Sequence, residues 1–155
     1  MGERFYIDCE FDGHNGPLLS MAIVAESDGF GVHMRTFESA KDPWVLANVM
    51  PLMDKHGAPI AFACPQEEFG DHLRYVMKGT DAPVIIADSP VDIGRFCQAL
   101  STGPDGGWAS ADYPRMTFEV HNVDCYPTTL PDAVQHNAWW DAMALRHILT
   151  TRPFT

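Results

Sequence analysis

The feature that most constrains this chain is a stretch near its start, R-F-Y-I-D-C-E-F at residues 4–11, which places two acids among large apolar residues. The apolar run predicts a buried strand. Because side chains alternate along a strand, Asp8 and Glu10 should lie on the same side of the sheet. Two close carboxylates on a buried strand repel each other, and a hard divalent cation is their usual partner. The alternative is an edge strand whose acids face water.

Length and composition are typical of one globular domain covering residues 1–155, with 46% hydrophobic residues. We expect no membrane partner and a cytoplasmic protein, because no apolar run is long enough to span a bilayer and the start lacks a signal-peptide pattern. The cysteines show no metal-finger spacing and should be reduced, mostly packed thiols: Cys9, Cys64, Cys97 and Cys125. The net charge of −11 argues against a broad basic nucleic-acid surface, but not against a small acidic site that holds nucleic acid through metal ions.

The order of apolar patterns and turn signals predicts an α/β fold with a mixed sheet. Three strands come first, as an antiparallel meander over residues 4–11, 18–26 and 30–37. Helical spacing of Trp44, Leu46, Val49 and Met53 follows, with Pro51 expected to split that helix. The remaining elements alternate: helix 65–78, buried strand 83–87, helix 91–100, loop 101–113, strand 116–123, loop 126–130 and helix 138–150. This is the order expected of a ribonuclease H-like fold.

Two further stretches carry candidate acids. In H-N-A-W-W-D, His136 precedes the last helix and Asp141 lies about one turn inside it, so both can face one point at the positive end of that helix. In D-S-P-V-D, Asp88 and Asp92 follow the buried strand, at the edge where open α/β sheets bind ligands. The alternatives are structural. His136 and Asp141 would be solvated or capping residues, Asp88 or Ser89 would cap the helix, and Asp92 would be an ordinary first-turn acid.

Together, D-x-E on the first strand, an aspartate opening a middle helix, and H-x-A-x-x-D near the end resemble the DnaQ-like (DEDDh) 3′–5′ exonucleases. The resemblance covers nearly the whole chain. Glu10-Phe11 makes the first motif D-x-E-F, which looks most like the short stand-alone exoribonuclease branch. The middle motif departs from the pattern, because the family often has asparagine where this chain has Asp88. The resemblance favours Asp92 over Asp88 as the middle ligand.

The resemblance implies four ligands for two Mg²⁺ or Mn²⁺ ions about 4 Å apart: Asp8, Glu10, Asp92 and Asp141. One ion would activate the attacking water and the other would stabilise the leaving 3′ oxygen. His136 would be the general base, a role that suits an imidazole at neutral pH. Phe11 and Cys9 would contact the substrate, with Phe11 either stacked on a base or packed in the core.

The implied substrate is single-stranded or 3′-overhanging nucleic acid, preferably RNA, cut to nucleoside monophosphates. The alternatives are a DNA exonuclease with the same site, or a catalytically silent nucleic-acid-binding relative. Arg95 and Arg115 are the candidates for holding the phosphate backbone, whereas His14 and His33 are expected to be surface residues. The family often pairs, so a homodimer is a further expectation.

Overall fold

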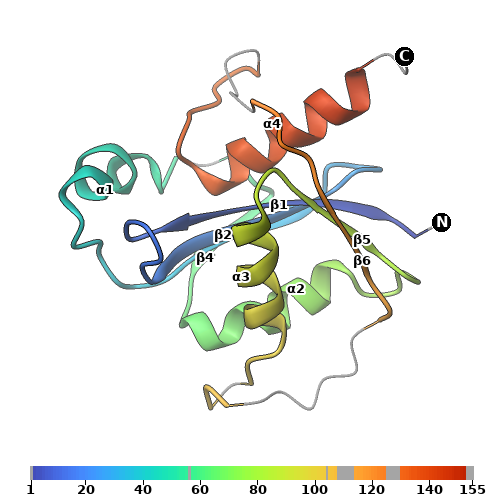
Figure 1. Cartoon of the computed structure of the whole chain (residues 1–155), viewed down its shortest axis with the longest axis horizontal. Coiled ribbons are helices and arrows are strands. Elements are labelled where there is room, and N and C mark those ends of the chain that lie inside the picture. Colours follow the sequence, from blue (N-terminus) through green and yellow to red (C-terminus); the bar gives the residue numbers. More distant parts are fainter. Residues whose placement is uncertain (1, 56, 104, 108–113, 125–129, 153–155) are drawn as a thin grey trace.

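The structure is a computed structural model that describes residues 2–55, 57–103, 105–107, 114–124 and 130–152 (Figure 1). Its strands are β1 (Arg4–Phe11), β2 (Leu18–Ala25), β3 (Gly31–Arg35), β4 (Ile60–Ala63), β5 (Val84–Ala87) and β6 (Thr117–Val120). Its helices are α1 (Pro43–Asn48), α2 (Phe69–Val76), α3 (Pro90–Leu100) and α4 (Ala138–Thr151), with 3₁₀ turns η1 (Met50–Leu52) and η2 (Gln66–Glu68). Cys125 and most of the loops predicted over 101–113 and 126–130 lie outside the described residues.

The strands form one six-stranded mixed sheet in the order β4-β3-β2-β1-β5-β6. β1, β2 and β3 make the predicted antiparallel meander, and β5 and β6 run parallel to β1. The predicted α/β class with a mixed sheet is therefore confirmed. β4, parallel to β3 at the edge, is an addition that the pattern of I-A-F-A did not indicate. A strand of four mostly exposed residues has little periodicity, and its pairing with β3 supplies what its sequence lacks.

Helices cover both faces of the sheet, with α4 on one face and α2 and α3 on the other (Figure 1). The core beneath α2 and α3 contains the fully buried side chains Phe5, Ile7, Phe69 and Phe96. The core beneath α4 contains Tyr6, Trp139 and Leu145. Alternation along β1 thus sends Tyr6, and with it Asp8 and Glu10, towards α4. Among the described residues, no helix is long and apolar enough to cross a membrane.

The predicted helix over residues 43–55 is split, as expected: α1 ends at Asn48 and Pro51 lies in the separate turn η1. Its predicted apolar face is partly wrong, because Trp44 is 55% exposed and Leu46 is also exposed, whereas Val45 is buried. The helix predicted over 65–78 begins as η2 and continues as α2, and the strand predicted over 116–123 is shorter, as β6. Cys97 is also exposed rather than packed.

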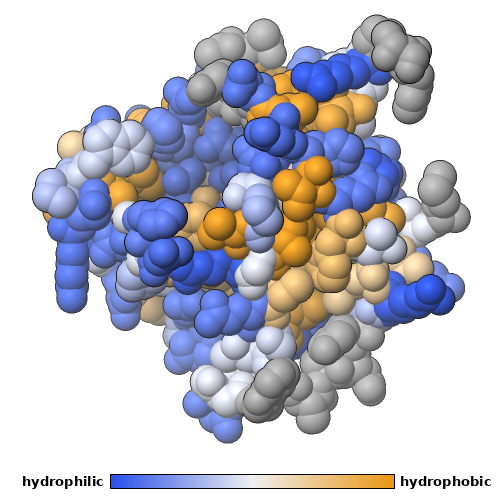
Figure 2. Space-filling model, viewed as in Figure 1, coloured by the Kyte–Doolittle hydropathy of each residue, from blue (hydrophilic) through white to orange (hydrophobic). Residues whose placement is uncertain are grey.

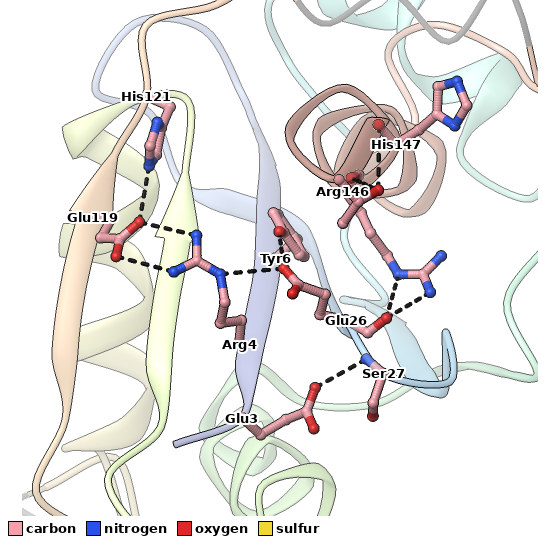
Figure 3. A network of polar contacts seen from close by, with 10 residues as sticks. Glu3, Arg4, Tyr6, Glu26, Ser27, Glu119, His121, Arg146 and His147 are labelled. Atoms are coloured by element: carbon pink, nitrogen blue, oxygen red, sulfur yellow. Dashed lines mark hydrogen bonds and ion pairs between the residues drawn. The ribbon is translucent and has the colours of Figure 1, made fainter. Parts of the chain in front are cut away.

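At the amino end of β1, away from Asp8 and Glu10, a polar network holds α4 against the sheet (Figure 3). Arg4 donates two hydrogen bonds of 3.1 Å to Glu119 of β6 and one of 3.2 Å to Glu26. The Tyr6 hydroxyl donates to the same Glu26 carboxylate. Arg146 of α4 donates to the Glu26 carbonyl oxygen at 2.7 Å. These contacts hold the carboxyl-terminal half of α4 against the sheet, and so help to fix where its amino end lies.

Apolar side chains gather over the region of α3, β5 and β6 in the view of Figure 2. Val91 on α3 and Phe118 and Val120 on β6 are among the exposed large apolar residues. β6 is the edge strand on this side of the sheet. Solvent therefore reaches these side chains from the side where no further strand pairs.

Candidate active site

All five acids singled out in the sequence come together at one edge of the sheet. Asp8 and Glu10 lie in the carboxyl-terminal half of β1, and Asp88 directly follows β5. Asp92 is in the first turn of α3 and Asp141 in the first turn of α4. Because β1 and β5 are parallel, their carboxyl ends meet at the same edge, where ligands bind in open α/β sheets. The amino ends of both helices add partial positive charge there.

The acids form two groups that share one residue. Asp8, Asp88 and Asp92 each offer a carboxylate oxygen within 4.8 Å of the other two, and so do Asp8, Glu10 and Asp141. Asp8 thus lies between two places where a cation could be held by three carboxylate oxygens. The sequence favoured Asp92 over Asp88, but the structure brings both to Asp8. Asp92 is the more buried of the two, at 4% exposure.

Burial makes ionisation of these acids unfavourable. It raises the pKa of Asp8 and of Glu10 well above their ordinary values, and the neighbouring carboxylates add to the effect. Burial and then the charge of Asp88 raise the pKa of Asp92 to about 8 and that of Asp141 to about 7. In the absence of a cation, the cluster must therefore keep protons near neutral pH.

Those protons are shared within two carboxyl pairs. A hydrogen bond to Asp141 favours the protonated form of Glu10, and the same bond favours the charged form of Asp141. Asp92 and Asp88 form the equivalent pair, in which Asp92 keeps the proton. A divalent cation in either group would replace the shared proton as the positive charge between the carboxylates.

Unpaired oxygen atoms show that the donor set fits such cations. Among the described residues, Asp8 Oδ2 and Asp141 Oδ1 are buried and have no hydrogen-bond partner. Leaving a buried polar atom unpaired costs about 1–3 kcal/mol, and more if it is charged. Carboxylate oxygens are the ligands that Mg²⁺ and Mn²⁺ prefer. Bound cations would pair these atoms and relieve the repulsion among the acids.

His136 lies beside this cluster, next to Asp141. Hydrogen bonds from the backbone of His136 and Asn137 favour the charged form of the Asp141 carboxyl. The His136 backbone has a φ of +59°, in the left-handed region that non-glycine residues rarely adopt. Its ring packs edge-on against the Trp44 ring, with centroids 5.2 Å apart and planes at 83°. The backbone of His136 thus contacts the acid cluster, its ring packs on Trp44 of α1, and the residue remains partly exposed.

Asn137 is a site residue that the sequence interpretation missed. Its side chain is buried, and its carbonyl oxygen caps α4 by accepting from the backbone N–H groups of Trp139 at 3.1 Å and Trp140 at 3.3 Å. Its amide group donates to the Leu52 carbonyl oxygen of η1 at 2.8 Å. Asn137 therefore joins η1 to the amino end of α4, directly beside His136. An asparagine preceding a helix pattern is an N-cap signal and could have identified it.

A second chain of caps positions Trp44 against His136. After β1, the Asp12 carboxylate accepts the backbone N–H of Asp42 at 2.9 Å. Asp42 in turn caps α1, accepting from the N–H groups of Trp44 at 2.9 Å and Val45 at 3.0 Å. The turn that follows Asp8 and Glu10 thus fixes the start of α1. Through α1 it also fixes the Trp44 ring that packs against His136.

Phe11 and Arg95 lie at the end of β1. The Phe11 ring is half-buried against the core beneath α2 and α3. The Arg95 guanidinium carbon lies 4.9 Å from the ring centroid, and the side chain also donates to the Gly16 carbonyl oxygen. The sequence left open whether Phe11 is core or substrate-facing. The structure shows a ring that packs on one side and carries a cation over its face.

The other predicted residues differ in how close they lie to the acids. Cys9 is buried in the core opposite α4, and its hydrogen bonds to Asp92 oppose the rise in the pKa of that carboxyl. Arg115 precedes β6, at the end of the sheet opposite the acids, because β6 is parallel to β5. The structure therefore places Arg115, a candidate for holding the phosphate backbone, away from the acids. His14 is exposed, as expected.

A cavity of about 310 Å³ lies on the α4 side of the sheet, over β3 and β4. His33 and Arg35 line it, and the strand register places them in the rows of Asp8 and Glu10, two strands away. His33 is buried, so the prediction of a surface residue is wrong. Arg35 donates to the Asp54 carboxylate at 2.6 Å. Arg35, which lines this cavity, is therefore a cationic side chain on the same face of the sheet as Asp8 and Glu10.

Comparison of the chain with protein-family models and with curated proteins found no match. Its function must therefore be inferred from the site itself. That site is a cluster of five acids arranged around Asp8, with His136 close to Asp141 in sequence and in backbone contact with it, and Phe11 next to Glu10 on β1.

Proposed function

We propose that this chain is a metal-dependent 3′–5′ exonuclease of the DnaQ-like (DEDDh) kind, with a ribonuclease H-like fold. It removes nucleoside monophosphates from the 3′ end of single-stranded or 3′-overhanging nucleic acid and prefers RNA. The observation that carries this proposal is that Asp8 belongs to two carboxylate groups at once. A shared carboxylate between two three-oxygen groups is the arrangement that a pair of divalent ions needs for phosphodiester hydrolysis.

Asp8 and Asp92, with Asp88 beside them, would hold one Mg²⁺ or Mn²⁺ ion, and Asp8, Glu10 and Asp141 the other. When bound, these ions supply activation of the attacking water and neutralisation of the charge that develops on the phosphate. A phosphodiester anion would otherwise be repelled by five acids in a chain of net charge −11. The acids therefore bind substrate only together with cations.

His136 accepts the proton of the attacking water as general base. It is the histidine beside Asp141, and its neighbour Trp44 limits how far the ring can turn. Asn137 and the left-handed backbone at His136 fix the segment that carries the imidazole, which is not proposed as a ligand. Positioning of this kind is what general-base catalysis requires.

The surroundings of the acids support a single-stranded polynucleotide as the substrate. Phe11 directly follows Glu10 at the end of β1, and Trp44 packs against His136, so two aromatic side chains lie next to residues of the proposed site. Stacking on such rings is tolerant of base identity and needs unpaired bases. Arg95 near Phe11 and Arg35 in the adjacent cavity are the cations available to phosphates. The preference for RNA rests on the D-x-E-F form of the first motif.

The decisive experiment is digestion of matched RNA and DNA oligonucleotides, labelled at the 5′ end, with Mg²⁺ or with excess chelator. The proposal predicts a ladder that shortens by one nucleotide at a time from the 3′ end, faster on RNA, only with the metal. Asp8→Asn is the matched inactive control, because it removes the carboxylate that both groups share.

Each other outcome contradicts a stated part of the proposal. Internal cuts would exclude exonuclease action, and equal rates in chelator would exclude the metal-dependent mechanism. Faster digestion of DNA would replace RNA with DNA as the preferred substrate. Binding of the oligonucleotides without any cleavage would identify a catalytically silent relative.

A further inference from the structure

A second cluster of metal-ligating side chains lies away from the acids. Cys64, Glu68 and His72 each offer one ligand atom, and these three atoms lie within 4.8 Å of one another. Cys64 belongs to the core beneath α2 and α3, whereas Asp8 and Glu10 point to the α4 side of the sheet. The two clusters share no residue, and Cys64 follows the edge strand β4, which lies three strands from β1.

Each of the three side chains is fixed by a different element. Cys64 directly follows β4, and its N–H donates to the Arg35 carbonyl oxygen at 2.9 Å, which extends the pairing with β3 by one residue. Its side chain is 5% exposed. Glu68 ends η2, and His72 lies one turn further on, in α2. The His72 ring packs against Phe62 of β4, with centroids 4.5 Å apart and planes at 64°.

Glu68 is an exposed residue at the point where η2 passes into α2. It occupies the N-cap of α2, where a side-chain oxygen normally accepts a backbone N–H, yet its carboxylate makes no cap hydrogen bond. Glutamate is also not among the residues that favour this position. The carboxylate instead lies with the thiol and the imidazole. Its spacing of four residues from His72 puts the two on the same face of the turn.

Sulfur, nitrogen and oxygen donors form a set that differs in kind from the acid cluster. Mg²⁺ and Ca²⁺ bind oxygen ligands, whereas thiolate and imidazole together favour Zn²⁺ among the biologically abundant divalent ions. Zn²⁺ sites with three protein ligands keep a fourth position for water. We propose that Cys64, Glu68 and His72 bind one zinc-type divalent cation that joins the end of β4 to η2 and α2.

Such an ion would stabilise the edge of the sheet. β4 has four residues and is paired on one side only, with β3. A short strand of this kind is easily lost, and a cation bound only in the folded state stabilises it by mass action. Because β4 also lines the cavity that holds His33 and Arg35, the cation would help to keep that wall in place.

The test uses Co²⁺ as a spectroscopic substitute for Zn²⁺, added to the full chain carrying Asp8→Asn and Asp141→Asn. These changes remove ligands of the acid cluster and lessen its repulsion, so that the second site is observed alone. We expect one equivalent of Co²⁺ to produce a thiolate-to-cobalt charge-transfer band, which Zn²⁺ abolishes. The band should be lost in Cys64→Ser and kept in Cys97→Ser, which changes an exposed free cysteine.

His72→Gln provides a second variant, because it leaves the buried Cys64 in place and removes the partly exposed imidazole. It should weaken Zn²⁺ binding, measured by competition with a chromogenic chelator. Zn²⁺ at about 100 times its dissociation constant should raise Tm by about 5–10 °C in the Asp8→Asn/Asp141→Asn protein. That rise should disappear in His72→Gln.

Absence of the charge-transfer band, or its persistence in Cys64→Ser, would overturn the proposal. Equal Zn²⁺ binding by His72→Gln and its parent would do the same. Because these readouts do not involve nucleic acid or Mg²⁺, they are independent of whether the acid cluster is a nuclease site.

Discussion

Without divalent cations, the acid cluster should make this protein less stable as the pH rises. The folded-state pKa is about 8 for Asp92 and about 7 for Asp141, against an ordinary value of 3.8. Between about pH 5 and about pH 7, the folded cluster therefore holds protons that the unfolded chain has released. Stability is greatest where both states are protonated and falls as the pH rises towards the folded-state pKa values.

The size of the effect follows from proton linkage. Each proton that the folded state holds and the unfolded state lacks changes the free energy of unfolding by about 1.4 kcal/mol per pH unit. If the folded cluster retains one proton that the unfolded chain has released, raising the pH from 5 to 7 lowers the free energy of unfolding by about 3 kcal/mol. Saturating Mg²⁺ should flatten this dependence, because the cation holds the carboxylates in their charged form. At about 100 times its dissociation constant it should add about 2.7 kcal/mol.

Urea unfolding in chelator and in Mg²⁺, at a series of pH values, measures both effects. Asp92→Asn should reduce the slope in chelator and raise the stability near pH 7, because it removes a buried acid while keeping its shape. Asp81→Asn, which changes an exposed aspartate outside the cluster, should change neither. A stability in chelator that is constant or rises with pH would refute the reasoning. So would a loss of stability near pH 7 in Asp92→Asn.

Three further predictions concern individual residues. His136→Ala should lower the exonuclease rate by about 10²–10⁴-fold and leave Mg²⁺ affinity, measured by titration calorimetry, nearly unchanged; full activity would remove His136 from the mechanism. Asp92→Asn should abolish most activity, whereas Asp88→Asn, at the more exposed partner, should keep most of it. The reverse order of rates on a labelled oligonucleotide would make Asp88 the essential ligand. Asn137→Ala should destabilise the fold by about 2 kcal/mol in urea and lower kcat, because the cap of α4 and the bond to Leu52 are both lost. Unchanged stability would show that these contacts contribute nothing.

The sequence alone predicted those parts of the molecule that depend on residues close together along the chain. The apolar run around Asp8 and Glu10 predicted β1 and the shared side of its acids, and turn signals predicted the meander. Pro51 indicated where the first helix would break. Helix-start patterns placed Asp92 and Asp141 in first turns. Alternation, proline geometry and capping are local properties, so they can be read without knowing what packs against them.

The tertiary structure decided what depends on contacts between distant segments. It added β4, which is a strand because β3 pairs with it. It brought Asp88 as well as Asp92 to Asp8, and placed Trp44 against His136 across more than ninety residues of chain, although spacing had assigned Trp44 to a buried face. It also separated Arg115 from the acids, because strand direction determines which end of β6 meets them. Pairing partner, strand direction and the distance between side chains belong to the packed sheet as a whole, and no local pattern encodes them.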